Sequence, residues 1–177
     1  KKQLIYEKAV LEIYNKPVLY FPKFFHPDPS VKRQSGVLKP IFNNSEIIGS
    51  SFQIPYFHVI SQNKDLTFKP TLFEDSMFMV QNEFRQLNKN SSFIADFNYL
   101  KNYKSNISKD KNSITHLFSK YFLDLNLDDY SLSTLNFSIQ KVSNDTYLKV
   151  FDSNLNEMAL KPGDKNNLKS SVILNLN

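Results

Sequence analysis

From residue 47 to the end, the sequence is a series of runs in which apolar and polar residues alternate. The run DLTFKPTLF at residues 65–73 shows the pattern clearly, because every second residue is Leu, Phe or Pro and most of the others are Thr or Lys. Short polar stretches separate the runs. Period-two runs joined by short turns are typical of an antiparallel meander. We therefore expect an all-β fold, with strands at residues 50–60, 65–73, 77–87, 92–100, 114–125, 134–142, 147–151 and 171–176 and no helix of any length between them.

Two further strands are expected before this series, at residues 4–14 and at residues 18–21, with Pro22 ending the second strand. Asn15 and Lys16 would form the turn between them, and residues 5–14 also fit a helix. Two strands are too few to bury a core of their own. Because both ends of the sequence read as strands, we expect the chain to be a fragment of a longer protein.

Residues 16–40 separate the two regions and contain five prolines and one glycine. Pro27 and Pro29 flank Asp28, so the backbone there is held in extended or turn conformations. Residues 32–36 (KRQSG) form a polar break, and Val37 begins a new apolar run. This stretch is predicted to be a semi-rigid connector between two β units.

The composition excludes several classes of site. Only 3 glycines occur, without GxGxxG or GxxxxGK[ST], so no glycine-rich nucleotide loop is present. No cysteine occurs, which excludes thiol catalysis and disulfides within this span. The histidines His26, His58 and His116 lack ligand spacing, so we expect no metal, no cofactor and no enzyme activity. The basic residues behind the net charge of +5 are scattered, which does not favour nucleic acid.

Periodicity alone leaves open where the apolar sides of the strands point. In a soluble β-sandwich binding module they would face a core. In an outer-membrane barrel they would face lipid, and the polar sides would line the lumen. The strand lengths match the roughly 9–11 residues that cross a bilayer, the apolar sides are rich in Phe and Tyr, and the polar sides carry charges such as Lys69 and Asp96. A generic outer-membrane pore also fits these features.

Specific motifs in the connector and the first strands point to one family. The connector contains PVLYFP at residues 17–22, HPDPS at 26–30 and KRQSG at 32–36, followed by Leu38 and Pro40. Downstream come IPY at residues 54–56, DLTFKP at 65–70, EFR at 83–85 and VSNDTYL at 142–148. In this order, the motifs resemble the LPS-assembly outer-membrane protein family LptD, also called organic solvent tolerance protein.

The resemblance implies a fragment of a lipopolysaccharide translocon in the Gram-negative outer membrane. Residues 1–25 would be the last strands of a periplasmic β-jellyroll, residues 26–46 a linker, and residues 47–177 the first strands of an incomplete transmembrane β-barrel. The implied partners are lipopolysaccharide, a plug lipoprotein inside the barrel, a periplasmic bridge protein of similar jellyrolls, and outer-membrane lipids.

Pro55 and Pro70 are the candidate gate residues. Each lies within an otherwise regular run, and a proline removes a donor from the ladder. The residues by themselves allow an irregular edge or a bulge. The resemblance implies a lateral gate, in which prolines of the first two strands loosen the seam between the first and last barrel strands so that lipid A slips sideways into the membrane.

A second set of candidates concerns the lipid path. Phe21, Phe24 and Phe25 fit either the greasy exit of the jellyroll or its core. Lys32 and Arg33 lie at the domain junction, where charge-assisted contacts to the phosphates of lipid A are chemically suitable. A solvated polar linker would have the same composition.

Overall fold

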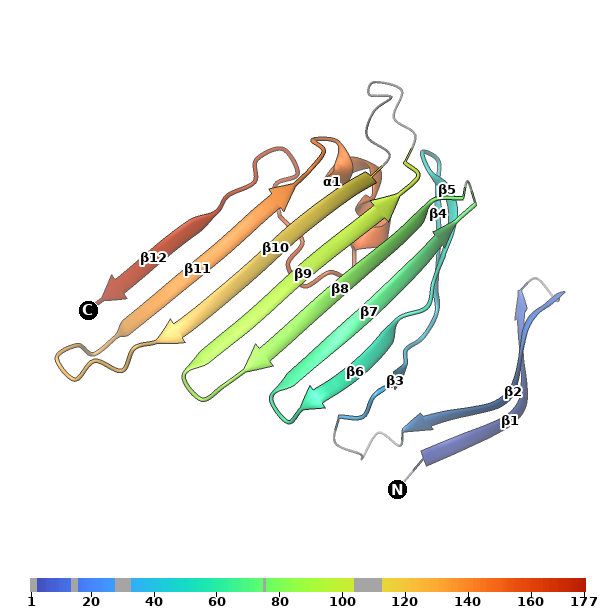
Figure 1. The fold of residues 1–177 in the computed structure, drawn as a ribbon, viewed down its shortest axis with the longest axis horizontal. Coiled ribbons are helices and arrows are strands. Elements are labelled where there is room, and N and C mark those ends of the chain that lie inside the picture. The colour runs from blue at the N-terminus through green and yellow to red at the C-terminus, as the bar shows by residue number, and fades with distance from the viewer. Residues whose placement is uncertain (1–2, 14–15, 28–32, 75, 104–112) are drawn as a thin grey trace. The chain divides into compact units, whose positions relative to one another are not determined.

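The computed structural model describes residues 3–13, 16–27, 33–74, 76–103 and 113–177. The chain forms two compact units, Lys1–Gly36 and Val37–Asn177. Figure 1 shows the elements of each unit.

The first unit is an antiparallel pair of strands, β1 (Gln3–Ile13) and β2 (Lys16–Pro27). The helix considered for residues 5–14 is therefore wrong. The prediction that Pro22 ends the second strand is also wrong, because β2 continues to Pro27. The ladder skips one step instead, between the pairs Glu7–Lys23 and Ala9–Phe21. Lys8, the residue within this gap on β1, has a φ of 55°.

The second unit is a 10-stranded antiparallel sheet, which confirms the predicted all-β antiparallel meander. From one edge to the other the strands lie in the order β12-β11-β10-β9-β8-β7-β5-β4, with β6 also beside β7 and β3 beside β6. The strands are β3 (Gly36–Val37), β4 (Ile41–Ser45), β5 (Gly49–Gln53), β6 (Tyr56–Ser61), β7 (Lys64–Phe73), β8 (Phe78–Leu87), β9 (Ser91–Lys101), β10 (Ser113–Asp124), β11 (Ser133–Val142) and β12 (Ser171–Leu176).

The run at residues 50–60 differs from the prediction, because it is divided into β5 and β6. Ile54 and Pro55 lie between these strands. Both strands nevertheless pair with β7 in one continuous register, since Gln53 is opposite Thr71 and Tyr56 is opposite Phe68. The division follows from Pro55, which has no N–H to contribute to a ladder.

The strand predicted at residues 147–151 is wrong. These residues form the short helix α1 (Tyr147–Val150), followed by the 3₁₀ turn η1 (Asp152–Leu155). Tyr147, Leu148, Phe151 and Leu155 are all buried, and their spacing is that of one helical face. The side-chain oxygen of Asn144 accepts hydrogen bonds from the backbone N–H and the hydroxyl of Thr146, which turns the chain just before α1.

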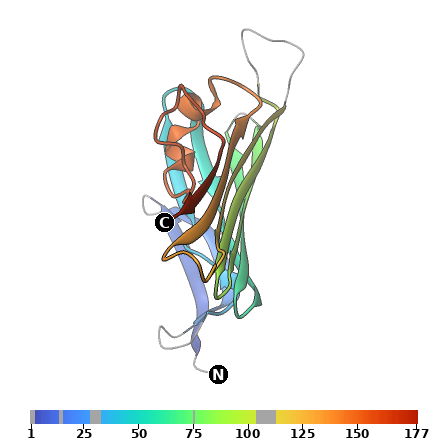
Figure 2. The ribbon, with the colours of Figure 1, turned by 90° about the vertical axis from the view of Figure 1, so that its left-hand side faces the viewer.

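The sheet packs its core on one face only. Figure 2 shows α1 and the coil around it lying against one face of the sheet. The core forms between this segment and the sheet, and its buried members are Ile48, Phe73, Met77, Met79, Leu100, Ile114, Phe118, Tyr147, Leu148, Phe151, Leu155 and Met158. Among the described residues, none of the helices has the length and hydropathy needed to cross a membrane.

The opposite face of the sheet is apolar and exposed. Phe97 lies in β9, a central strand of the sheet, and is 45% exposed. Leu72 lies in β7, two strands away, and is 58% exposed. The same face carries further exposed apolar side chains, namely Phe42, Ile54, Tyr56, Ile60, Phe68, Phe78, Tyr99, Leu117, Phe137, Val172, Leu174 and Leu176. The face that is covered, in contrast, carries buried polar groups that include Thr71, Gln81, Asp96, Asn98 and His116.

Candidate functional site

The two candidate gate prolines lie next to each other in the sheet. The backbone N–H of Ile54 donates to the carbonyl of Pro70 over 3.2 Å. In an antiparallel ladder the N–H and the C=O of one residue point to the same neighbouring strand. The position without an N–H at Pro70 therefore faces Ile54, and the reciprocal bond of that pair cannot form.

Pro55 has the same effect on the other side of its strand. Its carbonyl accepts a 2.8 Å hydrogen bond from the N–H of Leu38, so its own missing donor faces the segment between β3 and β4. Pro55 is buried, and Pro70 is half-buried within β7. The line from β5 to β6 is thus weakened towards both neighbours within two consecutive residues, Ile54 and Pro55.

The sequence reasoning missed Pro40. This residue connects β3 with β4, and these strands flank β6 and β5 at the edge of the sheet. Pro40, Pro55 and Pro70 therefore lie in three adjacent rows of the sheet, formed by β3 with β4, by β5 with β6, and by β7. Their even spacing of 15 residues (55 − 40 and 70 − 55) is the signal that would have revealed the third proline.

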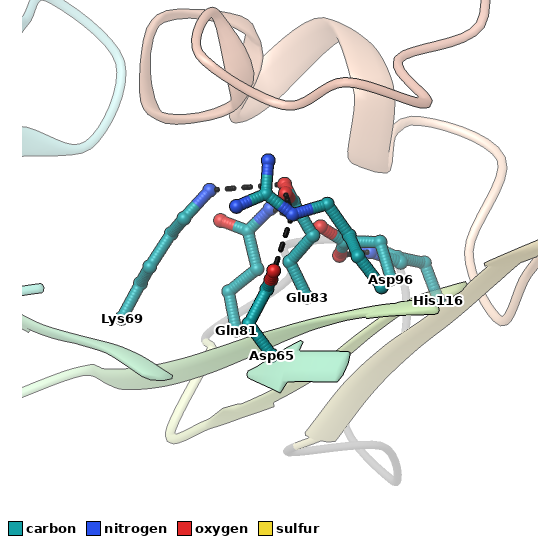
Figure 3. Close-up of polar contacts among 7 residues, drawn as sticks. Asp65, Lys69, Gln81, Glu83, Asp96 and His116 are labelled. Carbon is teal, nitrogen blue, oxygen red and sulfur yellow. Dashed lines mark hydrogen bonds and ion pairs between the residues drawn. The ribbon is translucent and has the colours of Figure 1, made fainter. Parts of the chain in front are cut away.

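Charged residues of β7 and β8 form one group on the covered face of the sheet (Figure 3). Nε of Arg85 lies 2.8 Å from Oδ1 of Asp65 and 3.7 Å from Oε1 of Glu83. Nζ of Lys69 lies 3.4 Å from Oε2 of Glu83. The side chains of Asp65 and Glu83 are nearly buried, whereas 47% of the Arg85 side chain is exposed. This group presents a cation and hydrogen-bonding carboxylates along a hydrophilic face.

A second polar group, the Tyr147 network, joins the sheet to α1. Nε2 of His116 lies 2.6 Å from Oδ1 of Asp96, and Nδ1 lies 2.8 Å from the Tyr147 hydroxyl. Asn98 Nδ2 donates to the same hydroxyl over 2.8 Å, and Gln81 Nε2 donates to Asp96 Oδ2 over 2.9 Å. With Nε2 donating to Asp96, a neutral His116 accepts the Tyr147 proton at Nδ1.

The Tyr147 network is sealed from solvent. The side chains of His116 and Asp96 have no exposed surface. Burial, reinforced by the negative charge of Asp96, raises the pKa of Tyr147 well above its usual range, so the hydroxyl keeps its proton at neutral pH. No substrate atom can reach this His–Asp pair while α1 is docked, and the network therefore acts in docking α1.

The candidate lipid-path residues lie apart from the prolines in the chain. Phe21, Phe24 and Phe25 belong to β2 of the first unit, opposite Ala9, Tyr6 and Ile5 of β1. Arg33 is exposed in a bend before β3. Lys32 lies outside the described residues.

The described part of the chain contains no group of three or more His, Asp or Glu side chains that could hold a metal ion. Asp65, Glu83 and Asp96 each pair with a side chain of a neighbouring strand.

Comparisons with known proteins identify one group of relatives. The LPS-assembly protein LptD of Pseudoalteromonas translucida is 33% identical over 146 residues, which are 82% of this chain and 19% of that protein. The protein of the same name from Xanthomonas oryzae pv. oryzae is 35% identical over 164 residues, 93% of this chain and 19% of that protein. No protein-family model matches the chain. The chain spans about a fifth of the length of these relatives.

Proposed function

The chain belongs, over the stretch it shares with these relatives, to the family of the LPS-assembly protein LptD, and from this premise we propose that it is part of an outer-membrane translocon that inserts lipopolysaccharide into the outer leaflet. In this proposal residues 1–25 are the end of a periplasmic jellyroll, residues 26–46 lead into the membrane, and residues 47–177 form part of the barrel wall.

The distribution of side chains between the two faces of the sheet is the observation that carries this proposal. An isolated sheet in water would cover its apolar face and expose its polar one. Here the Phe-rich face is exposed, and Asp65, Lys69, Glu83 and Asp96 lie on the covered face. This arrangement suits a wall with lipid outside and a hydrophilic lumen inside.

The row formed by Pro40, Pro55 and Pro70, named the proline line here, supplies the exit route. Strand pairing is maintained by backbone hydrogen bonds, and each proline removes one donor. Pro70 removes a bond towards Ile54, between β5 and β6, and Pro55 removes one towards the segment between β3 and β4, which contains Pro40. A pair of strands that lacks hydrogen-bond donors at one level of the sheet separates at a lower free-energy cost than a regular ladder. Lipid A then passes sideways between the strands, while its saccharide stays in the polar lumen.

The remaining parts of the proposal follow the lipid and its partners. Phe21, Phe24 and Phe25 line the greasy path out of the jellyroll, and Lys32 and Arg33 meet the lipid A phosphates at the junction. A jellyroll bridge protein delivers the lipid, and a plug lipoprotein occupies the barrel. The chain performs no chemical reaction of its own, and the energy for transport comes from upstream.

Site-specific photocrosslinking to lipopolysaccharide in the full-length protein tests this function. A photoreactive residue replaces Phe21, Phe25, Pro55 or Phe57 in turn during active transport. We expect energy-dependent lipopolysaccharide adducts both in the first unit and at the proline line. Adducts at neither place, in a protein that still reaches the outer membrane, would contradict the proposal and favour a generic outer-membrane pore.

A further inference from the structure

The segment that covers the polar face is separate from the strands that form the sheet. This segment, residues 144–168, is named the strap here. It contains α1 and η1 and connects β11 with β12. Its contacts span the sheet from β5, where Asn154 Nδ2 donates to Ser51 Oγ over 2.9 Å, to β10, where Tyr147 meets His116. Phe151 also packs edge-on against Phe73 of β7, with the ring centroids 6.0 Å apart.

The strap covers the hydrophilic groups that a saccharide would meet on this face. Gln81, Asp96, Asn98 and His116 are each at most 1% exposed. They belong to three neighbouring strands, and Figure 3 shows Gln81, Asp96 and His116 on the side of the sheet over which the strap passes. A polar molecule that moves along this end of the face therefore has to displace the strap.

The contact between the strap and the sheet combines an apolar core, which includes Phe151 and Leu155 of the strap, with a buried polar network. The polar part is not required to hold two fixed layers together, because apolar side chains of similar size would do so at least as well. Asn98 Oδ1 is buried without a hydrogen-bond partner among the described residues. A buried polar network that is only partly satisfied makes a weaker contact than a complete one. Tyr147 and Asn154 hydrogen-bond to side chains of the sheet, in addition to the apolar contacts of the strap.

We infer that the strap is a movable cover on the hydrophilic path, fastened by Tyr147 and Asn154, and that it lifts for the saccharide of a phosphorylated glycolipid to pass. This inference rests on the proposed function, because it assumes that the polar face is the route of the saccharide. It adds that the closed strap blocks that route. The moving part is defined by the strap contacts and is distinct from the proline line.

A reversible disulfide between the strap and the sheet tests the inference. The chain itself has no cysteine, so a new pair has no competing thiol within this span. Ser51→Cys with Asn154→Cys places a cysteine on each side of the contact in which Asn154 Nδ2 lies 2.9 Å from Ser51 Oγ. The full-length protein carrying both changes is the only copy in the cell, and the arrival of lipopolysaccharide at the surface is measured with and without a reductant.

A second cysteine pair provides the control. Ser138 and Ser171 are cross-strand partners in β11 and β12 with their Oγ atoms 2.9 Å apart. Ser138→Cys with Ser171→Cys therefore crosslinks two strands that the inference does not require to separate. The single variants Ser51→Cys and Asn154→Cys show whether either substitution alone disturbs folding.

We expect the oxidised strap pair to reduce surface delivery at least tenfold, the reductant to restore it, and the control pair to deliver normally in both states. Normal delivery by a fully oxidised strap pair would overturn the inference and make the strap a fixed wall. Failure of the unaltered protein to deliver lipopolysaccharide in the same assay would instead overturn the proposed function, so the two failures are distinguishable.

Discussion

At the scale of single residues, the strongest constraint is the direction of the hydrogen bonds around Tyr147. The hydroxyl accepts from Asn98 and has one proton to give, and Nδ1 of His116 is 2.8 Å away. His116 is stacked on Phe118 with ring centroids 4.5 Å apart, so its ring cannot turn easily to another partner. One side chain on the strap thus forms hydrogen bonds with two buried side chains of the sheet.

Replacing Tyr147 by Phe tests this network. The variant keeps the ring and its packing but leaves His116 and Asn98 without their common partner. Removing one partner of a buried hydrogen bond costs about 1–3 kcal/mol, so the free energy of unfolding should fall by that amount when folded and unfolded bands are followed by gel mobility in urea. Tyr130→Phe, at an exposed tyrosine, is the control. Equal stability of the two variants would contradict the account.

Asp152 provides a prediction about pH. Lys161 and Lys165 hold its carboxylate through charged hydrogen bonds, which lower its pKa from the ordinary 3.8. A carboxyl group with a lowered folded pKa stabilises the fold above its unfolded pKa, and this contribution disappears as the pH falls through the folded value. Asp152→Asn should therefore reduce stability slightly at neutral pH and have no effect once the pH lies below the lowered folded pKa of Asp152. Because the pair is partly exposed to solvent, the effect is small.

The partner of Asp152 supplies the check. Lys161→Gln removes the same ion pair from the other side, so the double variant should lose less than the sum of the two single variants. Strict additivity at neutral pH, measured by urea titration, would show that this ion pair does not stabilise the strap.

At the scale of elements, sequence periodicity predicted the strands well where one face is buried and failed where proline or a short helix intervened. The runs at residues 65–73 and 134–142 form β7 and β11, because strictly alternating apolar and polar residues fit a strand and do not fit a helix. Pro22 was tolerated inside β2, whereas Pro55 divided a strand, and local sequence does not distinguish these outcomes. Residues 147–151 are apolar enough for a strand, but they follow the turn made by Asn144 and are helical, with Tyr147, Leu148 and Phe151 buried.

The candidate site shows the same limits. Pro55 and Pro70 were identifiable because a proline inside a regular run is rare. The register decides which neighbouring strand loses a hydrogen bond at each proline. The hydrogen bonds of Ile54 and Leu38 in the structure establish that register. The Tyr147 network joins residues of β8, β9, β10 and α1, and its longest link spans 49 residues, from Asn98 to Tyr147. No sequence motif predicts a contact between residues so far apart in the chain.

The gate belongs to this scale, and restoring donors tests it. Pro70→Ala supplies an N–H aimed at Ile54, and Pro55→Ala supplies one aimed at the edge segment at Leu38. Each restored bond strengthens the seam by about 0.5–1.5 kcal/mol, so delivery of lipopolysaccharide to the surface should slow several-fold and slow further in the double variant. Val80→Ala, which changes the residue opposite Pro70 on β8 but restores no donor, is the control. Normal delivery by the double variant would exclude these prolines from the gate.

At the scale of the whole second unit, the account depends on which face of the sheet meets lipid. Phe97 of β9 and Asn136 of β11 lie on opposite faces, because Phe97 pairs with Leu117 and Asn136 pairs with Phe122 on the neighbouring strand β10. Phe97 belongs to the exposed apolar face, and Asn136 belongs to the face that carries the charged groups. A charge at these two positions should therefore have very different consequences in a bilayer.

The most direct measurement compares Phe97→Arg with Asn136→Arg in the full-length protein folded into lipid vesicles. An arginine on the lipid side of a barrel costs about 2–4 kcal/mol near the middle of the bilayer, whereas lumen positions tolerate it. The account predicts a loss of that size in folding free energy for Phe97→Arg and little change for Asn136→Arg. Equal effects, or a larger loss for Asn136→Arg, would contradict the assignment of the apolar face to lipid.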